Sequence, residues 1–135
     1  GIEPYLITSA LKGIISQRLV RKICPNCRRE YIPTDEELEN ISLDRHALDK
    51  RKFYRGEGCS ECLNTGYRGR TAVFEILMMT ADIKQKFHER APREELLKAI
   101  YASGFQTILH DCVRLVLDGI TTAEEAYRVL HSTDA

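Results

Sequence analysis

The chain has 135 residues, of which 20 are basic and 20 acidic, and its net charge is zero with a pI near 7.1. This is the length of one average domain, and the charge balance argues against a protein built around a nucleic-acid backbone. No apolar run approaches the roughly 20 residues that cross a bilayer, and we recognise no leader for export. The unusual feature is five cysteines, four of them in two Cys-x-x-Cys pairs.

The first predicted element is a helix that begins at Pro4 and continues to about Ile15, because apolar residues recur there at helical spacing. In residues 17–23, Leu19, Val20 and Ile23 lie among basic side chains, which predicts a short strand leading into the first cysteine pair, with the end of a helix as the alternative. The chain therefore reaches its first cysteines from a strand.

A second group of short elements is predicted between the two cysteine pairs. Thr34 and Glu37 form the pattern of a capping box, which predicts a short acidic helix over 34–41. Residues 44–52 are charged and have no periodicity, so we expect a loop, and residues 53–55 favour one more short strand.

The clearest strand is residues 71–77, which are rich in β-branched and aromatic side chains. Thr80 and Thr122 are expected to cap helices, the latter in a second capping box with Glu125, and the chain end after Leu130 is expected to fray. Four helices are predicted after this strand, over residues 80–90, 92–102, 105–119 and 122–130, with Pro92 in the first helical position of the second.

The candidate site is the tetracysteine set Cys24, Cys27, Cys59 and Cys62. Two thiolates separated by two residues can grip one metal ion from a tight turn, and two such turns complete a tetrahedral Cys₄ zinc site. The segment between the pairs is longer than in small zinc ribbons and must form an excursion of its own. We therefore expect one structural Zn²⁺ per chain, with no open position for catalysis.

Three other interpretations of the cysteines compete with zinc. Two disulfides would need an oxidising compartment. A thioredoxin-type redox pair occurs singly, in front of a long helix in a βαβ unit. An iron–sulfur cluster also uses four cysteines, but at other common spacings. Count and spacing together favour zinc.

The charges near the first pair are segregated, with six basic residues and no acid in 12–29 and six acids and no base in 30–44. A functional interpretation is contact with phosphates of nucleic acid or anionic lipid. The simpler interpretation, which we favour, is that the cations offset the thiolates and the acidic segment, because no aromatics are interleaved for base stacking.

No other residue pattern indicates an active site in this chain. Cys112 lies on an apolar helical stripe, where a buried thiol is the expected role. Three histidines are expected to be solvated, with no partner at ligand spacing: His46, His88 and His131. His110 lies two positions from Cys112 and is expected to point elsewhere on the helix. No phosphate-binding Gly-x-x-x-x-Gly-Lys-Ser/Thr loop occurs.

Seven segments form a recognisable series: residues 1–6, 17–21, 24–27, 58–71, 75–77, 104–109 and 119–125. Together they resemble the C-terminal part of the type II secretion and type IV pilus assembly ATPases, over essentially the whole chain. The most specific block is Thr-Gly-Tyr-Arg-Gly-Arg at 65–70, directly after the second cysteine pair.

The resemblance implies a parent protein that is a hexameric motor, peripheral at the cytoplasmic face of the bacterial inner membrane. Such motors hydrolyse ATP with Mg²⁺ and act on an inner-membrane platform protein. Their nucleotide-binding motifs would lie upstream of this chain, which would have no catalytic residue of its own. Expected partners are neighbouring subunits and the platform protein, without nucleic acid or a direct membrane span, and the isolated chain is expected to be a monomer.

The resemblance also implies an α+β fold that is mainly helical. It divides the chain into four segments: 1–23, the last helix and strand of the ATPase core; 24–66, the zinc module; 67–79, a returning strand; and 80–135, a C-terminal helical bundle. The strands at 17–23 and 70–77 would pair as a hairpin, with the zinc module inserted at its tip. Related retraction ATPases lack the four cysteines.

Two alternatives from other classes stay open. The first is a zinc-ribbon module that binds nucleic acid through Arg18, Arg21, Arg28 and Arg29. The second is a chaperone-like Cys-x-x-Cys module, to which Gly66 and Gly69 give a loose likeness. Type II secretion and type IV pilus assembly are not separated by the sequence.

Overall fold

The computed structural model describes residues 1–132, without the side chains of Pro4 and Tyr5, and shows an α+β fold. The fraying predicted after Leu130 concerns a segment whose last residues, 133–135, lie outside the described part. Within it, no helix has both the length and the apolar character needed to cross a bilayer. The helices are α1 (Pro4–Ala10), α2 (Asp35–Glu39), α3 (Ala81–His88), α4 (Arg93–Ala102), α5 (Ile108–Leu117) and α6 (Ala123–Leu130), and short 3₁₀ turns occupy Arg45–Ala47 and Ser60–Cys62.

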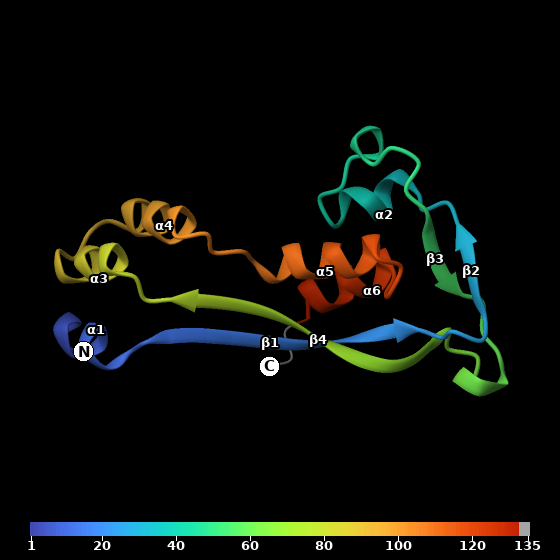
Figure 1. Ribbon diagram of the computed structural model, residues 1–135, viewed down its shortest axis with the longest axis horizontal. Helices are drawn as coiled ribbons and strands as arrows, with labels where there is room; N and C mark the ends of the chain where they lie inside the picture. Colours follow the sequence, from blue (N-terminus) through green and yellow to red (C-terminus); the bar gives the residue numbers. More distant parts are fainter. Residues whose placement is uncertain (133–135) are drawn as a thin grey trace. The chain divides into compact units, whose positions relative to one another are not determined.

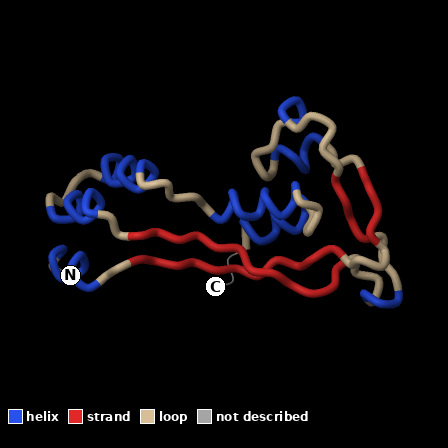
Figure 2. The backbone as a smooth tube through the Cα atoms, in the orientation of Figure 1, coloured by secondary structure: helices blue, strands red, loops and turns tan. Residues whose placement is uncertain are grey.

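Four strands form two small sheets. The long strands β1 (Gly13–Ile23) and β4 (Tyr67–Met78) pair with each other and run in opposite directions (Figures 1 and 2). The predicted hairpin is thus confirmed and is longer than expected. Between them, β2 (Arg28–Tyr31) pairs antiparallel with β3 (Phe53–Gly56), in a register that sets Arg28 opposite Gly56 and Tyr31 opposite Phe53.

The chain divides into two compact units. The first unit comprises Gly1–Ser16 and Phe74–Thr107, and the second comprises Gln17–Val73 and Ile108–Ala135. The helices expected as one region after residue 80 are therefore divided, since α3 and α4 belong to the first unit and α5 and α6 to the second. The assignment of the four predicted segments to a parent ATPase stays a prediction.

The first unit is built from α1, α3 and α4, with α3 packed against both of the others. Thr80 caps α3 as predicted, because its hydroxyl accepts a hydrogen bond from the amide of Ile83 at 3.3 Å. Ile83 is fully buried, and the Thr8 hydroxyl lies 3.1 Å from Nε2 of His88. These contacts tie the first helix to the third.

The second unit contains the main apolar core. Val20 of β1 and Val73 of β4 pack with the apolar faces of α5 and α6, and the excursion adds Leu38, Ile41 and Phe53. All five of these side chains are at least 94% buried, and burial of this kind contributes about 1.5–3 kcal/mol for each large side chain. The core thus joins the excursion to the last two helices.

Two predicted boundaries are wrong for local reasons, and one strand was missed. The first helix ends at Ala10, because β1 already begins at Gly13, where a Cβ atom would lie 2.9 Å from the carbonyl oxygen of Leu77. Strand β2 was not predicted. Pro92 is the cap of α4 and not its first helical residue, since its backbone is extended.

Candidate metal centre

The four predicted cysteines meet at one point of the second unit. Cys24 and Cys27 follow β1, while Cys59 precedes the 3₁₀ turn before β4 and Cys62 is the last residue of that turn. All four Sγ atoms lie within 4.8 Å of one another. The sulfur–sulfur distances are 3.8 Å for Cys24 and Cys59, 3.9 Å for Cys27 and Cys62, and 3.6 Å within the second pair.

These distances fit a tetrahedral metal. Zn–S bonds of about 2.3 Å place the sulfurs at the corners of a tetrahedron whose edges are about 3.8 Å. The same distances are far longer than the roughly 2.05 Å of a disulfide, and all four cysteines are free thiols. Three of them are buried and Cys59 is half-buried, as expected for a closed structural site.

Backbone amides point at two of the sulfurs. Gly58 donates to Sγ of Cys27 at 3.3 Å, while Cys59 and Gly66 donate to Sγ of Cys62 at 3.3 and 3.2 Å. Such donors stabilise negative charge on sulfur, so the turns favour thiolates over thiols.

Three of the thiols have shifted pKa values. Burial works against the thiolate of Cys62, but the amides of Gly66 and Cys59 prevail and bring its pKa to about 6. Contact with Asn26 lowers the pKa of Cys59. Burial raises the pKa of Cys27 to about 11. Cys62 therefore offers a thiolate more readily than Cys27, and a cation entering the site would displace the remaining thiol protons.

Two glycines let the cysteine turns approach. A Cβ atom on Gly56 would lie 2.1 Å from the carbonyl oxygen of Gly66, and one on Gly66 would lie 2.6 Å from that of Gly56. Two backbone hydrogen bonds then join the turns, from Cys24 to Gly66 at 2.9 Å and from Glu57 to Cys27 at 3.1 Å. The site depends on backbone contact as well as on the thiols.

The arginines considered for phosphate binding all have contacts within the chain. Arg18 donates to the carbonyls of Val129 and Ser132. Arg28 lies 3.9 Å over the ring of Tyr54. Arg29 forms a 3.8 Å ion pair with Glu57, and Arg21 is bound by Glu125. The chain therefore already uses these cations.

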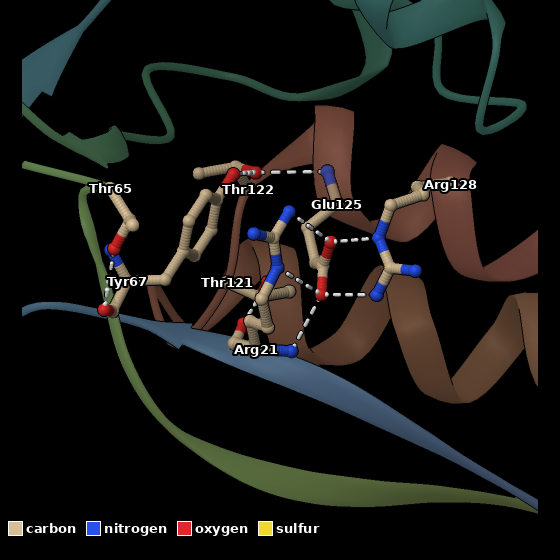
Figure 3. A network of polar contacts seen from close by, with 7 residues as sticks. All are labelled: Arg21, Thr65, Tyr67, Thr121, Thr122, Glu125 and Arg128. Atoms are coloured by element: carbon tan, nitrogen blue, oxygen red, sulfur yellow. Dashed lines mark hydrogen bonds and ion pairs between the residues drawn. The ribbon is translucent and has the colours of Figure 1, made fainter.

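A buried carboxylate organises the helical side of the second unit (Figure 3). Glu125 on α6 is fully buried and accepts from the backbone amide of Arg21 at 2.7 Å and from its guanidinium at 3.0 Å. Arg128 adds bonds of 2.6 and 2.9 Å. Although burial opposes the charge, these donors lower the pKa of Glu125 to about 2. Arg21 also lies 4.3 Å over the ring of Tyr67.

The sequence assigned Glu125 a different role. Thr122 caps α6 as predicted, accepting from the amide of Glu125 at 3.0 Å, but the carboxylate does not return to the cap. It reaches β1 instead. The overlooked signal is its place on the apolar face of α6, among Ala123, Ala126 and Val129.

The other residues considered as candidates are Cys112 and the four histidines. Cys112 is buried, and burial raises its pKa to about 11. All four histidines are exposed, although His88 contacts Thr8 and His131 lies 4.3 Å from the ring of Tyr127. In residues 1–132, the cysteines are the one group of three or more ligand side chains close enough to hold a metal.

Comparison with known proteins decides the family. The family model for type II/IV secretion system proteins matches residues 1–128. The chain belongs to this family. It is 36% identical to the type IV pilus assembly ATPase PilB of Thermus thermophilus over 125 residues, which are 93% of this chain and 14% of that protein. It is 38% identical to the type II secretion system ATPase E of Vibrio cholerae over 129 residues, 96% of this chain and 25% of that protein.

The predicted family is thereby confirmed. The type II secretion and type IV pilus assembly ATPases are similar to the chain to nearly the same degree. The type II secretion system protein E of Pseudomonas aeruginosa is 36% identical over 96% of the chain and 25% of its own length. The chain thus spans a quarter or less of these relatives. The matches do not bear out the expected placement at the C-terminal end of the family's members.

Proposed function

We propose that this chain is a zinc-stabilised, non-catalytic part of an ATPase that drives type II secretion or type IV pilus assembly. Cys24, Cys27, Cys59 and Cys62 would hold one Zn²⁺. The observation that carries the proposal is the cluster of four sulfurs, spaced for a tetrahedral metal, in a member of this family.

The ion would act as a structural crosslink. Four thiolates fill the coordination sphere of zinc, which leaves no position to activate water or polarise a substrate. The ligands come from the end of β1 and from the turn before β4, so the ion would hold both ends of the excursion that contains α2, β2 and β3. In small modules, zinc binding of this kind contributes an apparent free energy of roughly 10–16 kcal/mol to folding.

The activity belongs, in this proposal, to the whole protein. Relatives described as ATPases support a parent that hydrolyses ATP with Mg²⁺, outside the residues of this chain. The parent would work as a hexamer, peripheral at the cytoplasmic face of the inner membrane. The zinc-bound excursion and the helices would contact neighbouring subunits or the inner-membrane platform protein.

The nucleic-acid alternative has less support. A phosphate-binding surface needs cations that are available, and the four arginines considered for it bind carbonyls, carboxylates or tyrosine rings of the chain itself. The charge distribution is better explained as internal compensation.

Serine substitution of all four cysteines in the full-length protein tests the proposal. We expect the variant to lose its zinc and its secretion or pilus-assembly output. Cys112→Ala is the matched control, because it removes the one cysteine outside the cluster and should keep both. Normal output from a metal-free protein of normal abundance would refute the structural role of the site.

A further inference from the structure

A groove lies on the excursion, between the end of β2 and the segment that leads into β3. Its volume is about 500 Å³, which is within the usual range of small-ligand sites. The residues that line it are Glu30, Tyr31, Ile32, Pro33, Arg45, Leu48, Lys50, Arg51, Lys52 and Phe53. All of them belong to the second unit.

Internal contacts join the two segments that line the groove, residues 30–33 and 45–53. Arg45 donates to the carbonyl of Pro33 and binds the carboxylate of Asp35 at 2.6 Å. Lys52 forms a 2.9 Å ion pair with Glu30. The walls are thus joined by two ion pairs, and the groove belongs to the folded excursion.

The floor and one edge of the groove are apolar. Phe53 and Pro33 are buried beneath it and Leu48 is half-buried. Ile32, in contrast, is 84% exposed at its edge. An isoleucine this exposed beside an apolar floor offers contact area to a second molecule.

The rim is strongly basic. Four cations line the groove against one carboxylate, that of Glu30. Two of the cations are occupied by the ion pairs above, while the side chains of Lys50 and Arg51 are exposed and form no ion pair in the described part of the chain. The unneutralised charge therefore gathers at one place on the rim.

We propose that this groove binds an acidic peptide segment of a partner protein. An apolar side chain of that segment fills the floor, and carboxylates beside it pair with Lys50 and Arg51. Charge complementarity favours an acidic partner, and an apolar floor next to two cations fits an apolar side chain flanked by carboxylates, which an acidic peptide supplies. The inference goes beyond the zinc-stabilised role and does not depend on which metal the cysteines hold.

Binding of a labelled model peptide to the metal-loaded chain tests the inference. The peptide has a central leucine flanked on each side by two glutamates, and fluorescence anisotropy reports its Kd. We expect Lys50→Glu combined with Arg51→Glu to raise that Kd about tenfold or more, and added salt to weaken binding. Ile32→Ser should raise the Kd about threefold.

The matched control is Arg93→Glu combined with Lys98→Glu, which makes the same charge change at exposed positions of α4 and should leave the Kd unchanged. Peptides with glutamine for glutamate, or glycine for leucine, should bind at least several-fold more weakly. All substituted positions are exposed, and unchanged circular dichroism and metal content will verify folding. The inference is overturned if the peptide does not bind, if the Lys50/Arg51 variant binds it normally, or if phosphatidylglycerol vesicles or single-stranded DNA bind in its place.

Discussion

At the scale of single residues, Glu125 shows how a buried charge can serve packing. Its carboxylate is fully buried, yet each of its oxygens accepts hydrogen bonds from arginines of two different elements. The desolvation cost of the charge is offset by these donors. The result is a fixed link between β1 and α6.

Glu125→Gln should therefore destabilise the chain by about 2 kcal/mol. Breaking a buried pair costs about 3–5 kcal/mol, and we discount this because Arg21 and Arg128 are 41% and 52% exposed. Urea unfolding of the metal-loaded chain measures the effect. Glu124→Gln, at an exposed position of the same helix, is the control, and equal stability of the two variants would contradict the role of the buried carboxylate.

The same residue gives a pH dependence with a defined sign. The pKa of Glu125 is lowered in the folded chain to about 2, so its contribution is complete above the unfolded value near 4.5 and is lost as pH falls toward 2. We expect the difference in free energy of unfolding between the native chain and Glu125→Gln to be constant above about pH 5 and to shrink below about pH 4. Both proteins carry the same cysteines, and the comparison is made only at pH values where both still hold their metal. A difference that grows on acidification would be inconsistent with this sign.

What the sequence reveals at this scale depends on how far apart the partners are. The Cys-x-x-Cys spacing is local, and it correctly predicted which four thiols come together. The carboxylate of Glu125 and the amide of Arg21 are 104 positions apart in the sequence. The local Thr-x-x-Glu pattern predicts a capping box and could not reveal a hydrogen bond over that separation. The identity of the metal stays a prediction.

At the scale of elements, the close approach of Gly56 and Gly66 aligns the second cysteine turn. Gly66 has a φ of +82°, a conformation that L side chains rarely adopt, and its amide also donates to Cys62. One residue thus combines turn geometry, backbone contact and a bond to a sulfur.

Gly66→Ala should lower zinc affinity by about tenfold or more, because loss of a group that supports a metal ligand commonly has this effect. Competition with a chromophoric chelator provides the measurement. Gly104→Ala is the matched control: its φ is +91° and a Cβ atom would meet nothing within 4 Å, so it shares the backbone strain without the collision. Equal zinc affinity of the two variants would disprove the importance of the glycine contact.

Local signals explain which elements could be predicted. The capping box of α2 is present as expected, with Glu37 donating its amide to Thr34 at 3.1 Å and its carboxylate accepting from the Thr34 amide at 2.8 Å. Strand β2, in contrast, is Arg-Arg-Glu-Tyr with three exposed residues, and it is a strand because it pairs with β3. Its propensity alone could not predict that partner.

At the scale of the whole molecule, the proposed function makes the chain a structural part of a motor whose chemistry would lie in the rest of the protein. We expect the purified chain with Mg²⁺ and ATP to release no phosphate above a buffer blank, because its residues include no phosphate-binding loop. A coupled phosphate assay provides the measurement. Turnover that follows the chain through purification would contradict the non-catalytic role.

The central claim is that four sulfurs, brought together from the two ends of the excursion, hold one zinc ion that keeps the excursion folded. Native mass spectrometry of the chain, before and after chelation and alongside its circular dichroism, tests this claim most directly. We predict one zinc per chain, lost on chelation together with the ordered structure of the second unit and restored when zinc is returned. A chain without metal, with iron, or with two disulfides, and a fold unchanged by chelation, would each contradict it.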